Sequence, residues 1–364
     1  MIGLLTPVRT HKGTTLFNHS VKPIRPGERL RKTGGKTRSA LLLALSLACL
    51  PGMFRAGAQT APDAPESAAS LPEALIEKLS LGEEVKASIL KAVRAKDYQR
   101  AESILLDSLA HAAHSERAGE VLVLLGDVYF CASDYPQAVI AWIKSDAISP
   151  LDDRTRFQLA TTEVYVGRSD LARKQFVLLA NKNKDTALYQ YWLARLDYDA
   201  QQYKAAILRL EQVVKLEPGM ARGYDLLGLC HDFEGDSQAA IQAYAIAVRL
   251  NRRSPHPSSW PPLDYAITLI NVNRLDEASG LLHEAISYDS SNFKAVYEAG
   301  CVRESKGDFN GAVDSFTEAA RLNAKYPEPH YALARLYRRL GKPDLADHEV
   351  DLYKTLHQQA AAHP

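Results

Sequence analysis

An alanine recurs along this sequence at a nearly constant interval. It stands at positions 101, 138, 172, 206, 240, 278, 312 and 346, and five of the seven intervals are 34 residues long. Counted from 19 residues before each alanine, eight units begin at 82, 119, 153, 187, 221, 259, 293 and 327. A period of this length indicates a repeat architecture, and it replaces the two or three separate domains that 364 residues would otherwise suggest.

Two further positions of the unit keep a constant size. The eighth position is small in seven units: Gly126, Ala160, Ala194, Gly228, Ala266, Gly300 and Ala334. The twenty-fourth position is large or branched: Leu105, Trp142, Phe176, Leu210, Tyr244, Leu282, Phe316 and Val350. Small side chains let two helix backbones approach closely, and a large one fills the groove beside them. Each unit is therefore predicted to be two antiparallel helices, with the recurring alanine at their crossing.

The residues between these helices have the chemistry of turns and caps. Glycine occupies the fifteenth position in four units, where a left-handed residue would end the first helix: Gly167, Gly235, Gly307 and Gly341. Aspartate follows as a predicted cap of the second helix: Asp97, Asp134, Asp236 and Asp308. Pro136 and Pro343 stand where a second helix begins, and Pro150 and Pro218 stand where one ends.

These features resemble the tetratricopeptide repeat, whose pattern is W-x2-L-G-x2-Y, then A-x3-F, then P. Unit two carries the matching residues Leu125, Gly126, Tyr129, Ala138, Trp142 and Pro150. The resemblance implies an all-α fold, a right-handed α-solenoid or superhelix of about eight helix-turn-helix units. Unit one is degenerate, because Ser88 and Ile89 replace Leu-Gly. Four extra residues are inserted at 251–258, where a local change in superhelical pitch or a protruding loop is expected.

The resemblance also implies a concave groove that binds proteins or peptides. In the family this groove is lined by the second, fifth, ninth, twelfth and thirteenth positions of each unit. Aromatic and arginine side chains carry much of the binding energy at protein interfaces. The candidate partner-binding residues are Arg154, Phe157, Tyr165, Tyr191, Arg195, Tyr198, Arg222, Phe233, Trp260, Tyr297, Tyr331 and Arg335. The alternative, that many of these rings pack between neighbouring units, stays open at this point.

The amino-terminal segment predicts export. A basic stretch at 22–38 leads into the apolar ALLLALSLACL, and Ala56-Gly57-Ala58 follows. This order is typical of a signal peptide at 1–58 with an extended basic region and cleavage after Ala58, and a buried or membrane-held helix is the alternative. Cys49 is a weaker candidate for lipid anchoring, because Ser46 stands where that pattern expects a leucine.

The rest of the chain divides into three further predicted parts. Residues 59–70 have the Ala/Pro/Ser content of a flexible linker. Residues 71–118 are predicted to hold N-terminal helices and the degenerate first repeat. Residues 119–364 are predicted to form the superhelix, with a C-terminal capping helix.

No set of residues predicts catalysis, a metal site or a cofactor. His111 and His114 share a helix face without an evident third ligand, and His283-Glu284 lacks the second histidine of a zinc-protease helix. Cys131, Cys230 and Cys301 fall in units two, five and seven, which are not neighbours, so disulfides are not expected. Beyond residue 58 there are 34 basic and 42 acidic residues, a balance that argues against nucleic-acid binding.

The sequence thus predicts a non-enzymatic scaffold, exported to the periplasm or secreted, that binds partner proteins or peptides through its groove. It would organise an envelope or secreted complex. The alternative is a cytoplasmic regulatory or accessory subunit of an enzyme complex that keeps its amino terminus. Membrane proximity and self-association through the open ends of the solenoid remain open.

Overall fold

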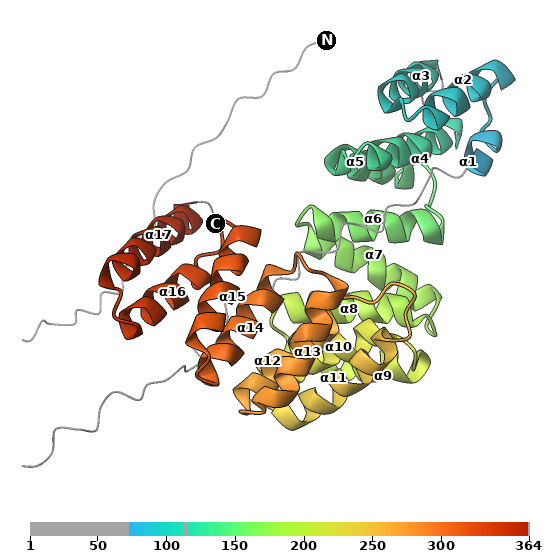
Figure 1. Cartoon of the computed structure of the whole chain (residues 1–364). Helices are drawn as coiled ribbons and strands as arrows, with labels where there is room; N and C mark the ends of the chain where they lie inside the picture. Colours follow the sequence, from blue (N-terminus) through green and yellow to red (C-terminus); the bar gives the residue numbers. More distant parts are fainter. Residues whose placement is uncertain (1–72, 112–115, 363–364) are drawn as a thin grey trace, which may run out of the picture. The chain divides into compact units, whose positions relative to one another are not determined.

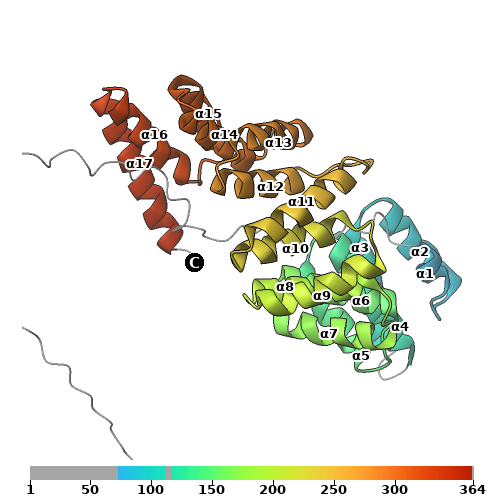
Figure 2. The ribbon, with the colours of Figure 1, turned by 90° about the horizontal axis from the view of Figure 1, so that it is seen from below.

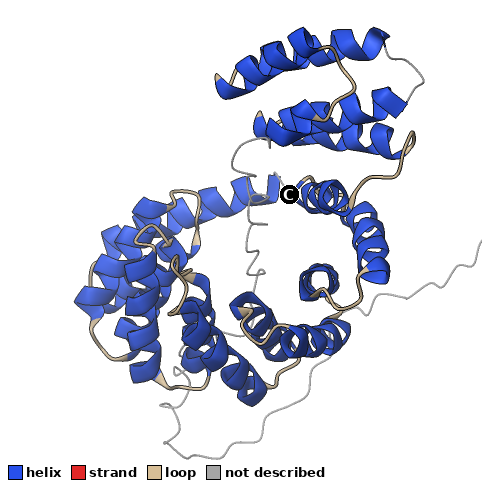
Figure 3. Cartoon of the chain, turned by 90° about the vertical axis from the view of Figure 1, so that its right-hand side faces the viewer, coloured by secondary structure: helices blue, strands red, loops and turns tan. Residues whose placement is uncertain are grey.

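The computed structural model describes residues 73–111 and 116–362, and within these ranges it contains helices and loops without strands (Figures 1 and 3). After α1 (Glu73–Glu77), the first helices of the units are α2 (Glu83–Arg94), α4 (Glu116–Cys131), α6 (Asp153–Tyr165), α8 (Ala187–Asp199), α10 (Ala221–Phe233), α12 (Trp260–Asn271), α14 (Phe293–Ser305) and α16 (Glu328–Arg339). The second helices are α3 (Tyr98–His111), α5 (Tyr135–Asp146), α7 (Ser169–Lys182), α9 (Tyr203–Leu216), α11 (Ser237–Asn251), α13 (Leu275–Tyr288), α15 (Phe309–Leu322) and α17 (Pro343–Ala362).

The helices pack in the order of the chain. Each first helix packs against the second helix of its own unit, and each second helix packs against the first helix of the next unit. The first helices α8, α10, α12 and α14 also contact one another in sequence. Figure 2 shows this succession of pairs from a second direction. The predicted all-helical α-solenoid is therefore confirmed.

The recurring alanine lies at the helix crossing, as its size predicts. The alanines at 101, 138, 172, 206, 240, 278, 312 and 346 all have no exposed surface. Every second helix thus presents the same small, buried residue to its neighbours. A larger side chain there would separate backbones that are close-packed.

The small eighth position meets the large twenty-fourth position of the same unit. A Cβ atom placed on Gly126 would lie 2.4 Å from Nε1 of Trp142, and one on Gly228 would lie 2.6 Å from Cε1 of Tyr244. These glycines are therefore required by an aromatic ring that occupies the place of their missing side chain. The Trp142 indole also donates hydrogen bonds to the Val123 carbonyl oxygen at 3.2 Å and to Asp127 at 3.1 Å.

The turn between the two helices is left-handed in all eight units. The four predicted glycines have φ between +71° and +84°. The other four units place a residue with a Cβ atom in the same conformation: Lys96, Ser133, Gln201 and Asn273. Sequence analysis missed these four positions, because only glycine signals a left-handed residue by itself.

The predicted aspartate caps are confirmed. In α5, α11 and α15, the carboxylate of Asp134, Asp236 or Asp308 accepts a hydrogen bond from the backbone N–H three residues later, at 3.0 to 3.2 Å. Asp97 accepts the equivalent bond from the N–H of Arg100 at 3.0 Å. Each cap satisfies a donor that the first turn of a helix leaves without a partner.

The insertion between units five and six forms the expected loop. The Asn251 side chain closes it at the end of α11: its amide nitrogen donates to the Ser258 carbonyl oxygen at 2.8 Å, and its oxygen accepts the Ser258 N–H at 2.9 Å. The extra residues are thus tied back to the solenoid by one buried side chain.

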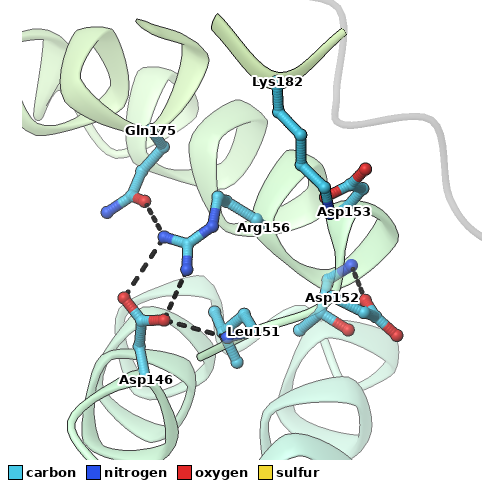
Figure 4. Close-up of polar contacts among 8 residues, drawn as sticks. Asp146, Leu151, Asp152, Asp153, Arg156, Gln175 and Lys182 are labelled. Carbon is cyan, nitrogen blue, oxygen red and sulfur yellow. Dashed lines mark hydrogen bonds and ion pairs between the residues drawn. The ribbon is translucent and has the colours of Figure 1, made fainter. Parts of the chain in front are cut away.

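An arginine in place of an aromatic residue links units two and three. Arg156 stands at the fourth position of its unit, where the family pattern has tryptophan. Its guanidinium contacts Asp146 of α5 at 2.6 and 3.2 Å and donates to Gln175 of α7 at 2.6 Å (Figure 4). Asp146 also accepts the Leu151 N–H at 3.0 Å. One side chain therefore joins three helices from two adjacent repeats.

Several predictions lie outside the described residues. These are the signal peptide at 1–58 with its cleavage after Ala58, the candidate lipid site Cys49, the linker at 59–70, and His114. They stay predictions.

Candidate partner-binding surface

The first helices carry all the predicted partner-binding residues. They lie on α6 (Arg154, Phe157, Tyr165), α8 (Tyr191, Arg195, Tyr198), α10 (Arg222, Phe233), α12 (Trp260), α14 (Tyr297) and α16 (Tyr331, Arg335). Because α8, α10, α12 and α14 contact one another in turn, residues at equivalent positions of these helices are brought close together. Their individual surroundings differ, however, and divide them into two groups.

Six of the predicted rings contact aromatic rings elsewhere in the fold, and two of them, Tyr165 and Tyr331, do so while remaining exposed, 4.7 Å from Tyr135 and 5.4 Å from Tyr353. Phe157 lies edge-on to Phe176, with the ring centroids 5.9 Å apart. Phe233 stacks on Tyr203 of the preceding unit at 4.7 Å and lies edge-on to Tyr198 at 5.7 Å. Tyr297 packs in the same way, 5.3 Å from Phe316 and 5.5 Å from Tyr326. The two contacts of Phe233 join adjacent units, as does the contact of Phe157 with Tyr189 at 5.9 Å, whereas the contacts of Tyr297 lie within its own unit. For Phe157, Tyr198, Phe233 and Tyr297, packing therefore describes their surroundings.

Other predicted residues present a surface to solvent. Arg154, Tyr165, Arg222, Tyr331 and Arg335 are exposed, with Tyr331 at 56%. Half-buried Trp260 is covered on one face by the Lys294 ammonium, 5.4 Å from the ring centroid. An arginine or aromatic side chain that stays accessible on a folded protein is the type that dominates binding interfaces.

The densest set of polar groups lies where α8 meets α10. The Arg222 guanidinium lies 4.9 Å from the centroid of the buried Tyr191 ring. Arg195, one turn after Tyr191, is mostly buried and contacts Asp199 at 3.2 Å. A cation over a ring keeps its charge while its hydrocarbon stem covers apolar surface. Arg222 is therefore held against the Tyr191 ring and remains accessible to a partner.

Asp225 stands one turn after Arg222 on α10. Its Oδ1 atom is inaccessible to water and accepts no hydrogen bond. Burial, and then the neighbouring carboxylate of Asp264 on α12, raise the pKa of Asp225 well above its usual range. Burial thus favours the protonated form of Asp225 more than it would for an exposed carboxyl, and the group lies one turn from the exposed Arg222.

Two exposed arginines neutralise partly buried acids. Arg154 contacts Asp127 at 3.2 Å, yet burial outweighs this contact and raises the pKa of Asp127 to about 6. Arg335 of α16 pairs in the same way with Glu304 of α14. Both arginines therefore have a structural task in addition to any contact with a partner.

Sequence analysis missed a buried acid on α6. Glu163 occupies the eleventh position of its unit, where unit two and the family pattern have tyrosine. Both carboxyl oxygens are buried without a hydrogen-bond partner, and burial raises the pKa of Glu163 to about 7 although nearby Arg168 lowers it. An acid at a position where units two and eight have tyrosine was the signal in the sequence.

This carboxyl is expected to make stability depend on pH. Because the folded-state pKa lies above the unfolded value of 4.5, the contribution of Glu163 is most favourable below pH 4.5 and is lost as the pH rises to about 7. Glu163→Gln should therefore stabilise the protein by about 2 kcal/mol at pH 8 and change little at pH 4.5. Urea unfolding of both proteins at the two pH values measures this. An equal difference at both values would contradict the assignment.

The residues considered for chemistry are dispersed. Cys131, Cys230 and Cys301 form no disulfide within the described residues, and burial raises the pKa of Cys230 to about 12. The part of the chain that the structure describes contains no group of three His, Cys, Asp or Glu side chains placed to hold a metal ion. None of its helices combines the length and apolar character needed to cross a bilayer. That the chain is not an enzyme stays a prediction.

Comparison with known proteins supports the assignment of the repeat made from the sequence and the helix pairs. The sequence model of the tetratricopeptide repeat matches residues 191–255 and 297–349. Among solved structures, a tetratricopeptide repeat protein from Parabacteroides merdae covers 74% of this chain and 98% of its own at a TM-score of 0.56 and 12% identity. A chain of the APC/C hetero-tetramer Cut9-Hcn1 covers 68% and 48%, at 0.54 and 16%. These likenesses concern the fold.

Two curated relatives are similar in sequence. The chain is 22% identical to BBSome complex member bbs-4 of Caenorhabditis elegans over 196 residues, which are 51% of this chain and 41% of the relative. It is also 22% identical to anaphase-promoting complex subunit 3 of Schizosaccharomyces pombe over 240 residues, which are 65% and 35%. The matches thus span less than half of either relative.

The repeat in the sequence, the stacked helix pairs and the family match lead to the same conclusion. The chain contains tetratricopeptide repeats at residues 191–255 and 297–349, and its other described helix pairs have the same helix-turn-helix fold. Repeats of this kind support a protein-interaction scaffold.

Proposed function

We propose that this protein is an exported scaffold that binds partner proteins or peptides along the first helices of its repeats and organises an envelope or secreted complex. The observation that carries the binding proposal is the group of side chains on α8 and α10. Arg222 is exposed and lies over the Tyr191 ring, and the Asp225 carboxyl, whose pKa is raised by burial, lies one turn away. A segment with both acidic and basic side chains would pair with the two groups.

The binding proposal is tested with variants of these two residues. Protein carrying Arg222→Glu and Asp225→Asn should lose at least about 10-fold in affinity for a partner that the wild-type protein captures from envelope extract and that is then purified. The matched control is Arg321→Glu on the second helix α15, which reverses another exposed charge whose partner is Glu318. Equal affinity of all three proteins would place binding elsewhere, and capture of no partner by folded wild-type protein would remove the proposal.

Export rests on the sequence of the first 58 residues. Mass spectrometry of the protein isolated from its native cells should give a chain that starts at Gln59. A chain that retains residues before Gln59 and fractionates with the cytoplasm would contradict export.

That second outcome would favour the alternative, a cytoplasmic regulatory or accessory subunit of an enzyme complex. Its motivation is the similarity to anaphase-promoting complex subunit 3 and to a BBSome member, whose names describe subunits of multi-protein complexes. The partner-binding surface would be the same in either case.

A further inference from the structure

The second helices expose two positions of every repeat, the twenty-second and the twenty-fifth. In α13, α15 and α17 these positions carry small, polar or charged residues: Gly280 and His283, Asp314 and Thr317, His348 and Asp351. In α5 they are Ile140 and Ile143, and in α7 they are Lys174 and Val177. Packing within the repeat makes no demand for isoleucine or valine here. The apolar residues of units two and three, like Leu106 of α3 and Leu208 of α9 at the same positions, therefore need another explanation.

Exposed apolar side chains are most numerous on α5, on α7 and just after the end of α5, while Leu106 of α3 and Leu208 and Leu216 of α9 are exposed as well. Ile140, Ile143, Ile148, Leu171, Val177 and Leu178 are 37% to 53% exposed, and we call them together the α5–α7 outer face. Among the described residues, α11, α13 and α15 expose no large apolar side chain to this extent. Single exposed apolar residues are ordinary, but a group on adjacent repeats marks a contact surface.

The two helices are held in a fixed relation by the side chain that joins them. Asp146, at the end of α5, and Gln175, in the middle of α7, both contact the guanidinium of Arg156 (Figure 4). Ile148 follows Asp146 by two residues, and Leu178 follows Gln175 by three. The apolar side chains next to this link therefore belong to one ordered surface.

The charges on this surface are mainly basic. Lys144 and Lys174 are exposed, and neither forms an ion pair within the described part of the chain, whereas Lys182 is tied to Asp153 at 2.8 Å. Asp170, in the first turn of α7, is the acid at the edge of the surface. Two unneutralised lysines flanking an apolar surface are complementary to a partner whose apolar side chains are flanked by acids.

The same charges argue against two other binding partners for this face, a second copy of this chain and an anionic membrane. A second copy of this chain, docked face to face, would bring Lys144 and Lys174 near their own counterparts, and like charges in an interface oppose binding. An anionic membrane is held by clusters of about four to eight basic residues, and two free lysines fall short of that.

We propose that the α5–α7 outer face binds an amphipathic helix of another protein, with an apolar seam flanked by Asp or Glu. This surface is distinct from the first helices and can act independently of them.

The test uses two fluorescent synthetic helical peptides with the same leucine seam, one flanked by glutamates and the other by lysines. The full chain should bind the glutamate peptide at least about 10-fold more tightly than the lysine peptide. Ile143→Glu with Val177→Glu should weaken that binding at least about 10-fold. The matched control, His283→Glu with Thr317→Glu, introduces the same charges at the same repeat positions and should change affinity less than about 2-fold. Circular dichroism confirms equal helicity.

Several outcomes would overturn the proposal. Equal binding of the two peptides, equal loss in both variants, or no binding of either peptide would each contradict it. Binding of phosphatidylserine vesicles in place of the glutamate peptide would assign the face to a lipid surface. A dimer that light scattering finds for the wild type, and that Ile143→Glu with Val177→Glu dissociates, would assign it to a second copy. The variant Arg222→Glu with Asp225→Asn should retain the peptide, so failure of one proposal is separable from failure of the other.

Discussion

Replacing Asp197 by alanine is expected to lower the free energy of unfolding by about 3 kcal/mol. Asp197 stands at the eleventh position of unit four, and its side chain is 3% exposed. Its two oxygens are shared by arginines of two second helices: Arg173 of α7 at 2.6 Å and Arg209 of α9 at 2.8 Å. Removing the carboxylate leaves two guanidiniums side by side without their common counter-ion. The cost stays near 3 kcal/mol because both arginines can still reach water.

The matched control lies two residues further along the same helix. Asp199 is 39% exposed and pairs with Arg195 one turn away at 3.2 Å, so Asp199→Ala should change stability by less than about 1 kcal/mol. Urea unfolding followed by circular dichroism measures both variants. Because repeat arrays can unfold in parts, hydrogen exchange in α7, α8 and α9 locates the loss. Equal stability of the two variants would show that the Asp197 cluster does not join units three and four.

The substitution Gly228→Ala is expected to destabilise the protein by about 2 kcal/mol, although alanine is a better helix former than glycine. The new Cβ atom would lie 2.6 to 2.8 Å from three ring atoms of Tyr244. That ring is fully buried, so it cannot move aside without disturbing its own neighbours. The helices α10 and α11 would have to separate, and packing would be lost along their whole contact.

The substitution Gly280→Ala is expected to change the stability of the same fold in the opposite direction. Gly280 lies inside α13, and a Cβ atom there would meet nothing within 4 Å. The helix preference of alanine then acts alone and should stabilise the protein by up to about 1 kcal/mol. Thermal and urea unfolding of the two variants give the comparison. If Gly228→Ala proved as stable as Gly280→Ala, close approach of α10 and α11 would not explain the small eighth position.

The sequence predicted the solenoid well because its determinants recur. A small residue at one crossing is weak evidence, but eight buried alanines in phase leave one arrangement of helices. The aspartate caps were also predictable, since a cap acts on a backbone donor three residues away. The left-handed turns at Lys96, Ser133, Gln201 and Asn273 were not, because these residues adopt that conformation only when the helices on both sides are fixed.

The candidate surface could be predicted only in part. The repeat position placed Arg222 and Phe233 on the same first helix, but it could not show that Arg222 stays accessible while Phe233 stacks on Tyr203 of the preceding unit. The sequence also does not show whether the pKa of an acidic side chain is shifted. Glu163 and Asp225 read as ordinary solvated carboxylates, and it is burial without a hydrogen-bond partner that raises their pKa values.

The sequence by itself determined the class of fold, the length of the repeat, the residues at which helices cross, and the turns that contain glycine. All of these depend on spacing along the chain, which a single sequence displays. Only the tertiary structure decided which side chains join the repeats and which remain accessible to a partner. Arg156 with Asp146 and Gln175, Asp197 with its two arginines, and the apolar outer face of α5 and α7 arise between helices. Their energies depend on burial and on distances across repeats, which spacing along the sequence does not specify.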